Sequence, residues 1–205
     1  MNGENQQERL LTPDYLAGFI DGEGCFSVTV HPNPNARFGW LIDPDFTINQ
    51  HRQSRELLES IRKFLGCGKI YEKSPNKINV LTFVVYGRRT ILEKIIPFLD
   101  AHPVLSNKRH DYAKFRDVVL RLTDKEHHTL EGFQNIVRIA FGMNAFGRQR
   151  KYKLEQVLIS SSETARRASR EQGEMKIQSE LSSDAESCAE MPQPANRLSA
   201  CSSET

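Results

Sequence analysis

The spacing of apolar residues alternates along the chain between the 3.6-residue period of a helix and the two-residue period of a strand. Thr12 can cap a helix that begins at Pro13, where the missing N–H of proline costs nothing. The segment 25–30 then alternates apolar and polar side chains, which is typical of a half-buried strand. Its apolar residues are expected on one face of a sheet and its polar residues on the other.

The rest of the pattern predicts a repeated strand–strand–helix order. A turn is expected at 31–35, and a second strand over 38–50 that is interrupted or bulged near Pro44. Gly66 is expected to end the helix that follows. The remaining expected elements are strands 68–74 and 78–86, a helix over 88–99 that Pro97 ends or bends, and helices over 108–122 and 125–141. This order, αββαββα followed by extra C-terminal helices, belongs to the α+β class.

Composition divides the 205 residues into a globular part and a tail. The stretch 160–205 has no aromatic residue and holds five Lys/Arg and eight Asp/Glu, which leaves residues 1–159 with a net charge of +5. We therefore expect a polar N-terminal arm over 1–11, a domain over 12–159, and a disordered Ser/Glu-rich tail over 160–205, with a helical continuation to about residue 176. The basic charge of the domain suits a nucleic-acid partner.

The four cysteines have no metal-binding or disulfide spacing, so a reducing compartment is expected. The sequence has no apolar leader and no run of apolar residues that could span a membrane, so no membrane partner is expected. The compartment is expected to be intracellular, either the cytoplasm of a prokaryote or an organelle, and the sequence does not choose between them.

The most informative stretch is LAGFIDGEG, residues 16–24. Gly18 and Gly22 lie four residues apart, so one face of the helix carries no side chains and a second helix could approach it closely. Two-fold pairing of such helices would bring two Glu23 carboxylates together. Paired carboxylates are oxygen ligands suited to Mg²⁺, which acts on phosphate esters.

This stretch resembles the signature of the LAGLIDADG homing endonucleases. The matching positions are Leu16, Ala17, Gly18, Ile20, Asp21 and Gly24. The resemblance covers about residues 10–145 and implies the αββαββα fold, with a saddle-shaped antiparallel sheet that sits in the major groove of DNA. A chain with one motif is expected to work as a homodimer, since it supplies half of the paired helices.

The resemblance also implies roles for particular residues. Glu23 and the backbone carbonyl of Gly22 are expected to bind Mg²⁺, for which Mn²⁺ could substitute. Gln50 is expected to order water near the scissile phosphate, and Lys108 to act through solvent on the developing charge. Ser54 stands where many family members have Arg or Lys, so a second basic active-site residue is not assigned. Asp21 does not share a helix face with Glu23 and is expected to contribute hydrogen bonds at the helix end.

Polar residues on one sheet face are expected to contact DNA, through base edges and phosphates. The predicted DNA-binding residues are Ser27, Thr29, His31, Asn33, Arg37, Asp45, Thr47, Lys69, Tyr71, Lys73 and Lys77. The predicted dimer-interface residues are Leu16, Gly18, Phe19 and Gly22.

The sequence thus predicts a site-specific endonuclease of the intron-homing type, which cuts both strands of a long pseudopalindromic DNA site by Mg²⁺-dependent hydrolysis. Two alternatives stay open at this point. One is an RNA maturase that assists splicing of an intron, with the intron RNA as its partner. The other is a DNA-binding regulator that keeps the fold but has lost catalysis.

Overall fold

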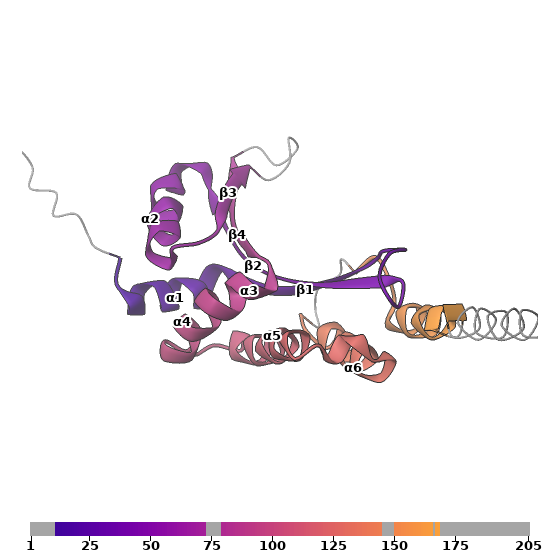
Figure 1. The fold of residues 1–205 in the computed structure, drawn as a ribbon. Coiled ribbons are helices and arrows are strands. Elements are labelled where there is room, and N and C mark those ends of the chain that lie inside the picture. Colours follow the sequence, from indigo (N-terminus) through magenta and orange to yellow (C-terminus); the bar gives the residue numbers. More distant parts are fainter. Residues whose placement is uncertain (1–10, 73–78, 145–149, 166, 169–205) are drawn as a thin grey trace, which may run out of the picture. The chain divides into compact units, whose positions relative to one another are not determined.

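The computed structural model describes residues 11–72, 79–144, 150–165 and 167–168. The chain falls into two units, residues 1–164 and residues 165–205, and the elements discussed below lie in the first. In chain order these elements are α1 (Pro13–Glu23), β1 (Gly24–Pro32), β2 (Trp40–His51), η1 (Arg52–Ser54), α2 (Arg55–Leu65), β3 (Lys69–Glu72), β4 (Val80–Tyr86), α3 (Arg88–Thr90), η2 (Ile91–Ile95), α4 (Ile96–Ala101), α5 (Lys108–Thr123), η3 (Glu126–His128) and α6 (Leu130–Phe141) (Figure 1).

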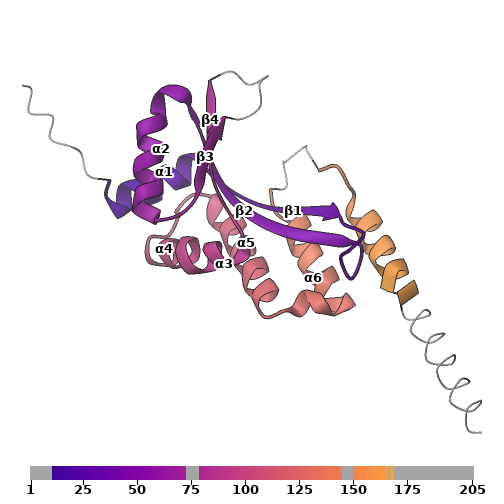
Figure 2. The ribbon, with the colours of Figure 1, turned by 45° about the horizontal axis from the view of Figure 1, so that its top comes forward.

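The strands form one antiparallel sheet in the order β1-β2-β4-β3. The predicted α+β class and the αββαββα order are therefore confirmed. The sheet twists between the long β1–β2 hairpin and the short β3–β4 pair, as the two views in Figures 1 and 2 show. Helices α5 and α6 run along one side of the β1–β2 hairpin, and α2 lies beside β3 and β4.

The core lies between the sheet and these helices. Phe26 of β1 packs its ring 5.4 Å from that of Phe46 and 5.4 Å from that of Phe115, and all three side chains are fully buried. Leu16 and Ile20 of α1 are also fully buried. Along β1 the apolar positions are buried and the intervening polar positions are not, which confirms the two faces expected for this strand.

The prediction of a break near Pro44 was wrong. β2 pairs with β1 without interruption from Trp40 to Ile48, and Pro44 lies opposite Val28. Pairing with β4 begins only at Asp45, so one edge of β2 has no strand partner in the described chain at Pro44. An edge position tolerates a residue that has no N–H to donate.

Two helix predictions also need correction. Of the two outcomes expected at Pro97, an end or a bend, the first is wrong, because helical structure continues to Ala101. A π-helical turn over Ile91–Ile95 precedes the proline, and such a wide turn gives room where the ring would crowd the preceding carbonyls. The helix expected from residue 125 begins only at Leu130, because Lys125 has a left-handed backbone (φ 62°) and Thr129 caps α6.

The first unit extends past residue 159, where the domain was expected to end. Residues 154–164 of this unit are helical, and Trp40 Nε1 donates a hydrogen bond of 2.8 Å to Ser160 Oγ. Val157 and Ser161 are fully buried. Almost all of the arm and of the tail predicted from the sequence lies outside the described residues. Within the described ranges, none of the helices has the length and apolar character needed to cross a membrane.

Candidate active site and DNA-contacting face

Local interactions fix both ends of α1 and place Glu23 at its end. Thr12 Oγ1 accepts a hydrogen bond of 3.2 Å from the N–H of Tyr15, and Pro13 is the first helical residue, as predicted. A Cβ added at Gly24 would lie 2.7 Å from the carbonyl oxygen of Ile20, so only glycine fits where the helix turns into β1. The side chain of Glu23, the last residue of α1, is exposed.

Asp21 anchors the loop that leads into α5. Its Oδ2 accepts hydrogen bonds of 3.0 Å from the N–H groups of Leu105 and Ser106, and Ser106 Oγ donates to Oδ1 at 2.5 Å. Desolvation opposes ionisation, but these hydrogen bonds and the nearby Lys108 ammonium outweigh it, so the pKa of Asp21 lies below its ordinary value. Asp21 thus makes hydrogen bonds at the helix end, as expected.

Lys108 is brought to the same corner as Glu23. It is the first residue of α5, and its Nζ donates to the carbonyl oxygens of Ile20 at 3.0 Å and Gly22 at 3.1 Å. A cation here is favourable at the C-terminal end of α1, where the helix dipole is negative, and it joins the N–H of Gly24 as a donor to the Ile20 carbonyl. Desolvation lowers the pKa of Lys108, and the carboxylates of Asp21 and Glu23 oppose that shift.

The donors at this corner suit a hard divalent cation. The Glu23 carboxylate is exposed, and the Gly22 carbonyl, although it accepts from Lys108, has a second lone pair. Mg²⁺ commonly binds through one or two carboxylates together with water and substrate phosphates. Among the described residues of one chain, no cluster of three or more His, Cys, Asp or Glu side chains could hold a metal by itself. The donors present therefore fit a shared site.

Gln50 and Ser54 lie near the end of β2. Gln50 is opposite Leu81 and, by the alternation of the strand, shares the face of the buried Phe46 and Ile48. Ser54 lies at the start of α2 without a capping side-chain hydrogen bond. The side-chain hydrogen bonds that converge on the end of α1 come from Ser106 and Lys108, and no contact of Gln50 adds to them within the described ranges.

One face of α1 is open. Gly18 and Gly22 would meet no other atom within 4 Å if they carried a Cβ. Phe19 stacks on the exposed Tyr15 with ring centroids 6.1 Å apart, and Leu105 is 78% exposed. Tyr15 and Leu105 were not among the predicted interface residues. The exposure of a leucine beside the motif helix becomes visible only in the fold. The assignment of Leu16 to the dimer interface was wrong, because it is fully buried in the core of its own chain.

The strand register gathers most of the predicted DNA contacts on one sheet face, since directly opposed residues share a face. Ser27 lies opposite Asp45, which lies opposite Tyr86. One row further, Cys25, Thr47, Val84 and Lys69 are aligned across all the strands. The residues on this face, called the reading face below, are Cys25, Ser27, Thr29, His31, Leu41, Asp43, Asp45, Thr47, Asn49, His51, Lys69, Tyr71, Val80, Thr82, Val84 and Tyr86.

Charges are unevenly distributed over the reading face. Ser27 Oγ donates a hydrogen bond of 2.6 Å to Asp45 Oδ1, and His31 Nδ1 lies 3.5 Å from Asp43 Oδ2. Desolvation raises the pKa of Asp45, and the charge of Asp43 adds to the shift while the hydrogen bond from Ser27 opposes it. At the other edge, Lys69 Nζ lies 5.4 Å from the centre of the Tyr86 ring.

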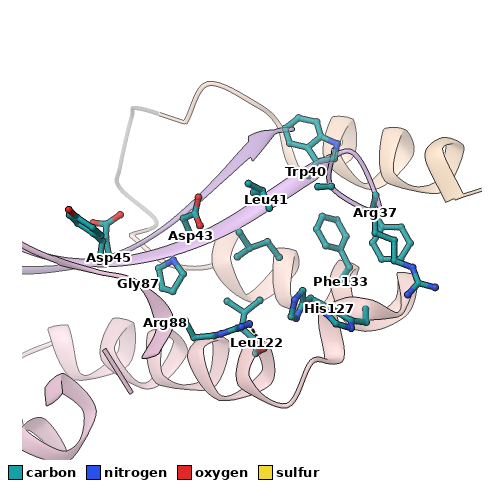
Figure 3. Close-up of a pocket in the computed structure, with 16 residues that line it drawn as sticks. Arg37, Trp40, Leu41, Asp43, Asp45, Gly87, Arg88, Leu122, His127 and Phe133 are labelled. Carbon is teal, nitrogen blue, oxygen red and sulfur yellow. Dashed lines mark hydrogen bonds between the residues drawn. The ribbon is translucent and has the colours of Figure 1, made fainter. Parts of the chain in front are cut away.

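Several predicted DNA contacts lie elsewhere. Asn33 and Arg37 belong to the turn between β1 and β2, where Asn33 Oδ1 accepts a hydrogen bond from the N–H of Asn35. Arg37 lies over the Phe38 ring and lines a pocket of about 780 Å³ beside the end of β2, together with His127 and Phe133 (Figure 3). This pocket does not include Glu23 or Lys108. Lys73 and Lys77 lie outside the described residues.

A groove of about 1410 Å³ joins Lys108 to β1. It is lined by Ser27, Thr29 and His31 of the reading face and by basic residues that the sequence analysis did not identify. These are His110, Lys114, Arg150 and Lys151. Their positions in helices and loops carry no sequence signal of their own, because only the tertiary fold brings them beside β1.

The antiparallel sheet with a free polar face, and the helix end that presents a carboxylate beside an ammonium, define a class of DNA-cleaving proteins. The family model described as LAGLIDADG endonuclease matches residues 16–119, and the chain belongs to this family. The resemblance noted from residues 16–24 is thereby confirmed.

Known relatives extend this finding. The homing endonuclease I-ApeII of Aeropyrum pernix is 28% identical over 155 residues, which cover 74% of this chain and 90% of the relative. The solved structure of the archaeal intron-encoded homing endonuclease I-Vdi141I complexed with DNA has a TM-score of 0.68 and 31% identity, covering 74% of this chain and 95% of that one. I-SmaMI bound to uncleaved DNA in the presence of calcium ions has a TM-score of 0.63 and 30% identity, covering 66% of this chain but 45% of its own.

Proposed function

We propose that this LAGLIDADG endonuclease is an intron-homing enzyme that acts as a homodimer and cuts both strands of a long pseudopalindromic DNA site by Mg²⁺-dependent hydrolysis. The observation that carries the proposal is the convergence of Glu23 and Lys108 at the end of a helix whose other face is open. Relatives named as homing endonucleases support DNA cleavage over the two alternatives, an RNA maturase and an inactive DNA-binding regulator.

In this proposal the chain supplies a small set of groups to the reaction. Glu23 and the Gly22 carbonyl hold Mg²⁺ (or Mn²⁺), which would supply Lewis-acid activation of the scissile phosphate and of water when bound. Lys108, held by the carbonyls of Ile20 and Gly22, stabilises negative charge that develops on the phosphate. Gln50, near the end of β2, orders water.

A second copy of the chain completes the site. One chain offers one exposed carboxylate at the end of α1, and the glycine face beside it has room for a second helix backbone. The stacked Tyr15 and Phe19 and the exposed Leu105 would add apolar area around that contact. The match covers 45% of the I-SmaMI chain. This supports a homodimer, because the longer relative has room for two units of this size in one chain.

The reading face would lie against DNA, with the groove beside β1 following the backbone. Polar side chains at every second position of β1 and β2 can reach base edges in a major groove that is wide enough for a two-stranded ribbon. Lys108, Lys114, Arg150 and Lys151 line the groove and would neutralise phosphates there. These contacts would extend along the DNA backbone between the bases that are read and the phosphate that is cut.

Replacement of Glu23 by Gln tests the proposal. The variant keeps size and polarity but loses the charged metal ligand, so cleavage should fall below detection while DNA affinity stays within a few fold of the unchanged protein. The matched control is Glu93→Gln, on an exposed ion pair with Arg89, which should cut normally. Mg²⁺-dependent cutting by Glu23→Gln would overturn the metal assignment, and splicing of an intron transcript without DNA cleavage by the unchanged protein would favour the maturase.

A further inference from the structure

The reading face has an acidic half and a basic half. Asp43 and Asp45 occupy successive outward positions of β2, opposite Thr29 and Ser27 of β1. Their carboxylates lie on the side of the strand turned away from the helices that carry Leu122 and His127 (Figure 3). On the described part of this face, the lysine lies at the other edge, on β3. Phosphates would repel the acidic half, so any DNA contact there must have another basis.

We propose that Asp45, together with Asp43, reads cytosine amino groups in the major groove. This inference rests on the proposed function, because it takes DNA as the ligand of the reading face. The inference goes beyond the proposed function because it assigns a base to a residue. It also makes the acidic half the source of sequence preference and Lys69 a source of affinity.

The chemistry of the groove limits what a carboxylate can bind. An ionised carboxylate only accepts hydrogen bonds, and the donors on base edges in the major groove are cytosine N4 and adenine N6. Adenine places the acceptor N7 beside its amino group, where it would face the second carboxylate oxygen, whereas cytosine has no acceptor there. A carboxylate on this face therefore favours cytosine.

The carboxylate of Asp45 is already oriented. Ser27 Oγ holds Oδ1 of Asp45 at 2.6 Å, and this half-buried side chain has little rotamer freedom left to lose on binding. His31 lies 3.5 Å from the more exposed Asp43. Desolvation and the neighbouring Asp43 charge make the ionised form of Asp45 less favourable, and an amino group of a base would relieve part of that cost.

The spacing of the two residues predicts a spacing in the DNA. Alternate residues of an antiparallel strand are about 6.8 Å apart, which corresponds to about two base-pair steps of 3.4 Å. Each half-site is therefore expected to contain two cytosine positions about two base pairs apart. The symmetry of a homodimer would repeat them in the other half.

The test is selection of bound duplexes from a pool randomised across the site, using the full-length unchanged protein and four variants. Asp45→Asn presents an amide N–H₂ in place of a carboxylate oxygen, so the preference for cytosine at one position per half-site should fall by about ten-fold. Ser27→Ala removes the orienting hydrogen bond and should weaken the same preference with the charge retained. Asp117→Asn, on an α5 ion pair with Arg121, should leave the selected sequence unchanged.

Lys69→Ala provides the contrast. It should keep the selected sequence but reduce the slope of affinity against salt by about one counterion. If the unchanged protein selects a sequence that Asp45→Asn also selects, the base assignment fails while the proposed function stands. If the unchanged protein selects no sequence and cuts no DNA, the proposed function fails, and the base assignment fails with it.

Discussion

The end of α1 and the outward face of β2 each hold a half-buried aspartate, and their surroundings shift the two pKa values in opposite directions. Hydrogen bonds from Leu105 and Ser106 outweigh desolvation at Asp21 and lower its pKa. At Asp45 desolvation prevails over the single hydrogen bond from Ser27, and the pKa is raised. Within the described residues, hydrogen bonds and the Lys108 ammonium stabilise the first charge more than desolvation opposes it, and for the second charge the balance is reversed.

This difference separates a positioning role from a ligand-binding role. Asp21 uses its charge to hold the loop that carries Lys108 to the carbonyls of Ile20 and Gly22. The surroundings of Asp45 disfavour its ionised form, and groups with perturbed pKa values are concentrated at functional sites. The comparison predicts that loss of Asp21 slows DNA cleavage, whereas loss of Asp45 changes which DNA sequence is bound.

The largest effect is expected on the open side of α1. Gly18→Leu adds a side chain where its own chain has nothing within 4 Å, and leucine is the better helix former by about 0.8 kcal/mol. The variant should fold with an unchanged melting temperature but sediment as a monomer and cut no DNA, because the side chain blocks a second helix. The comparison variant is Gly24→Ala, whose Cβ would lie 2.7 Å from the Ile20 carbonyl oxygen and should lower stability instead. A Gly18→Leu dimer that cuts at the normal rate would contradict the proposed interface.

A smaller but still large loss is expected from Asp21→Asn. The amide oxygen can still accept from the two N–H groups, but the charge is lost and the second oxygen becomes an N–H₂ group that cannot accept from the Ser106 hydroxyl, so the loop that carries Lys108 would be held less firmly. The cleavage rate should fall about 100-fold, as is typical when an oriented electrostatic group is displaced, with KM and DNA affinity nearly unchanged. Single-turnover cleavage and equilibrium binding separate the two quantities. Equal losses in rate and in affinity would indicate a general loss of structure.

Much of the fold followed from local patterns, because local chemistry determines those parts. Thr12, Pro13 and Gly66 marked helix ends correctly, since capping and left-handed backbone geometry depend on adjacent residues. The predictions made at Pro44 and Lys125 were wrong. Pro44 is tolerated because β4 does not pair with that edge of β2. Lys125 has a left-handed backbone, which is uncommon for a lysine and delays the start of the last helix to Leu130.

The candidate site was predictable to the extent that the LAGLIDADG motif defines it. The motif and the spacing to Lys108 indicated residues that the fold does bring together. The alternation of β1 and β2 indicated a polar face, and the register confirms that arrangement. The burial of Leu16, the exposure of Leu105 and the groove with Lys114 and Arg150 depend on contacts between distant segments, and no local pattern encodes them.

The smallest effects concern stability against pH, and they test the opposite pKa shifts directly. Asp21 has a folded-state pKa below 3.8, so its stabilisation is complete above 3.8 and is lost as the pH falls through the folded value. Asp45 has a folded-state pKa above 3.8, so its ionisation destabilises the fold progressively as the pH rises from 3.8 through the folded value. At pH 7 Asp21→Asn should lower the melting temperature by about 2–4 °C, and Asp45→Asn should raise it by about 1–3 °C. In thermal melts without DNA, the difference for Asp45→Asn should disappear as the pH falls through the raised folded-state pKa of Asp45 to 3.8, whereas the difference for Asp21→Asn should shrink only below pH 3.8, as the pH falls through the lowered folded-state pKa of Asp21. A stability loss for Asp45→Asn at pH 7 would mean that the folded chain does stabilise this charge, and the contrast between the two aspartates would fail.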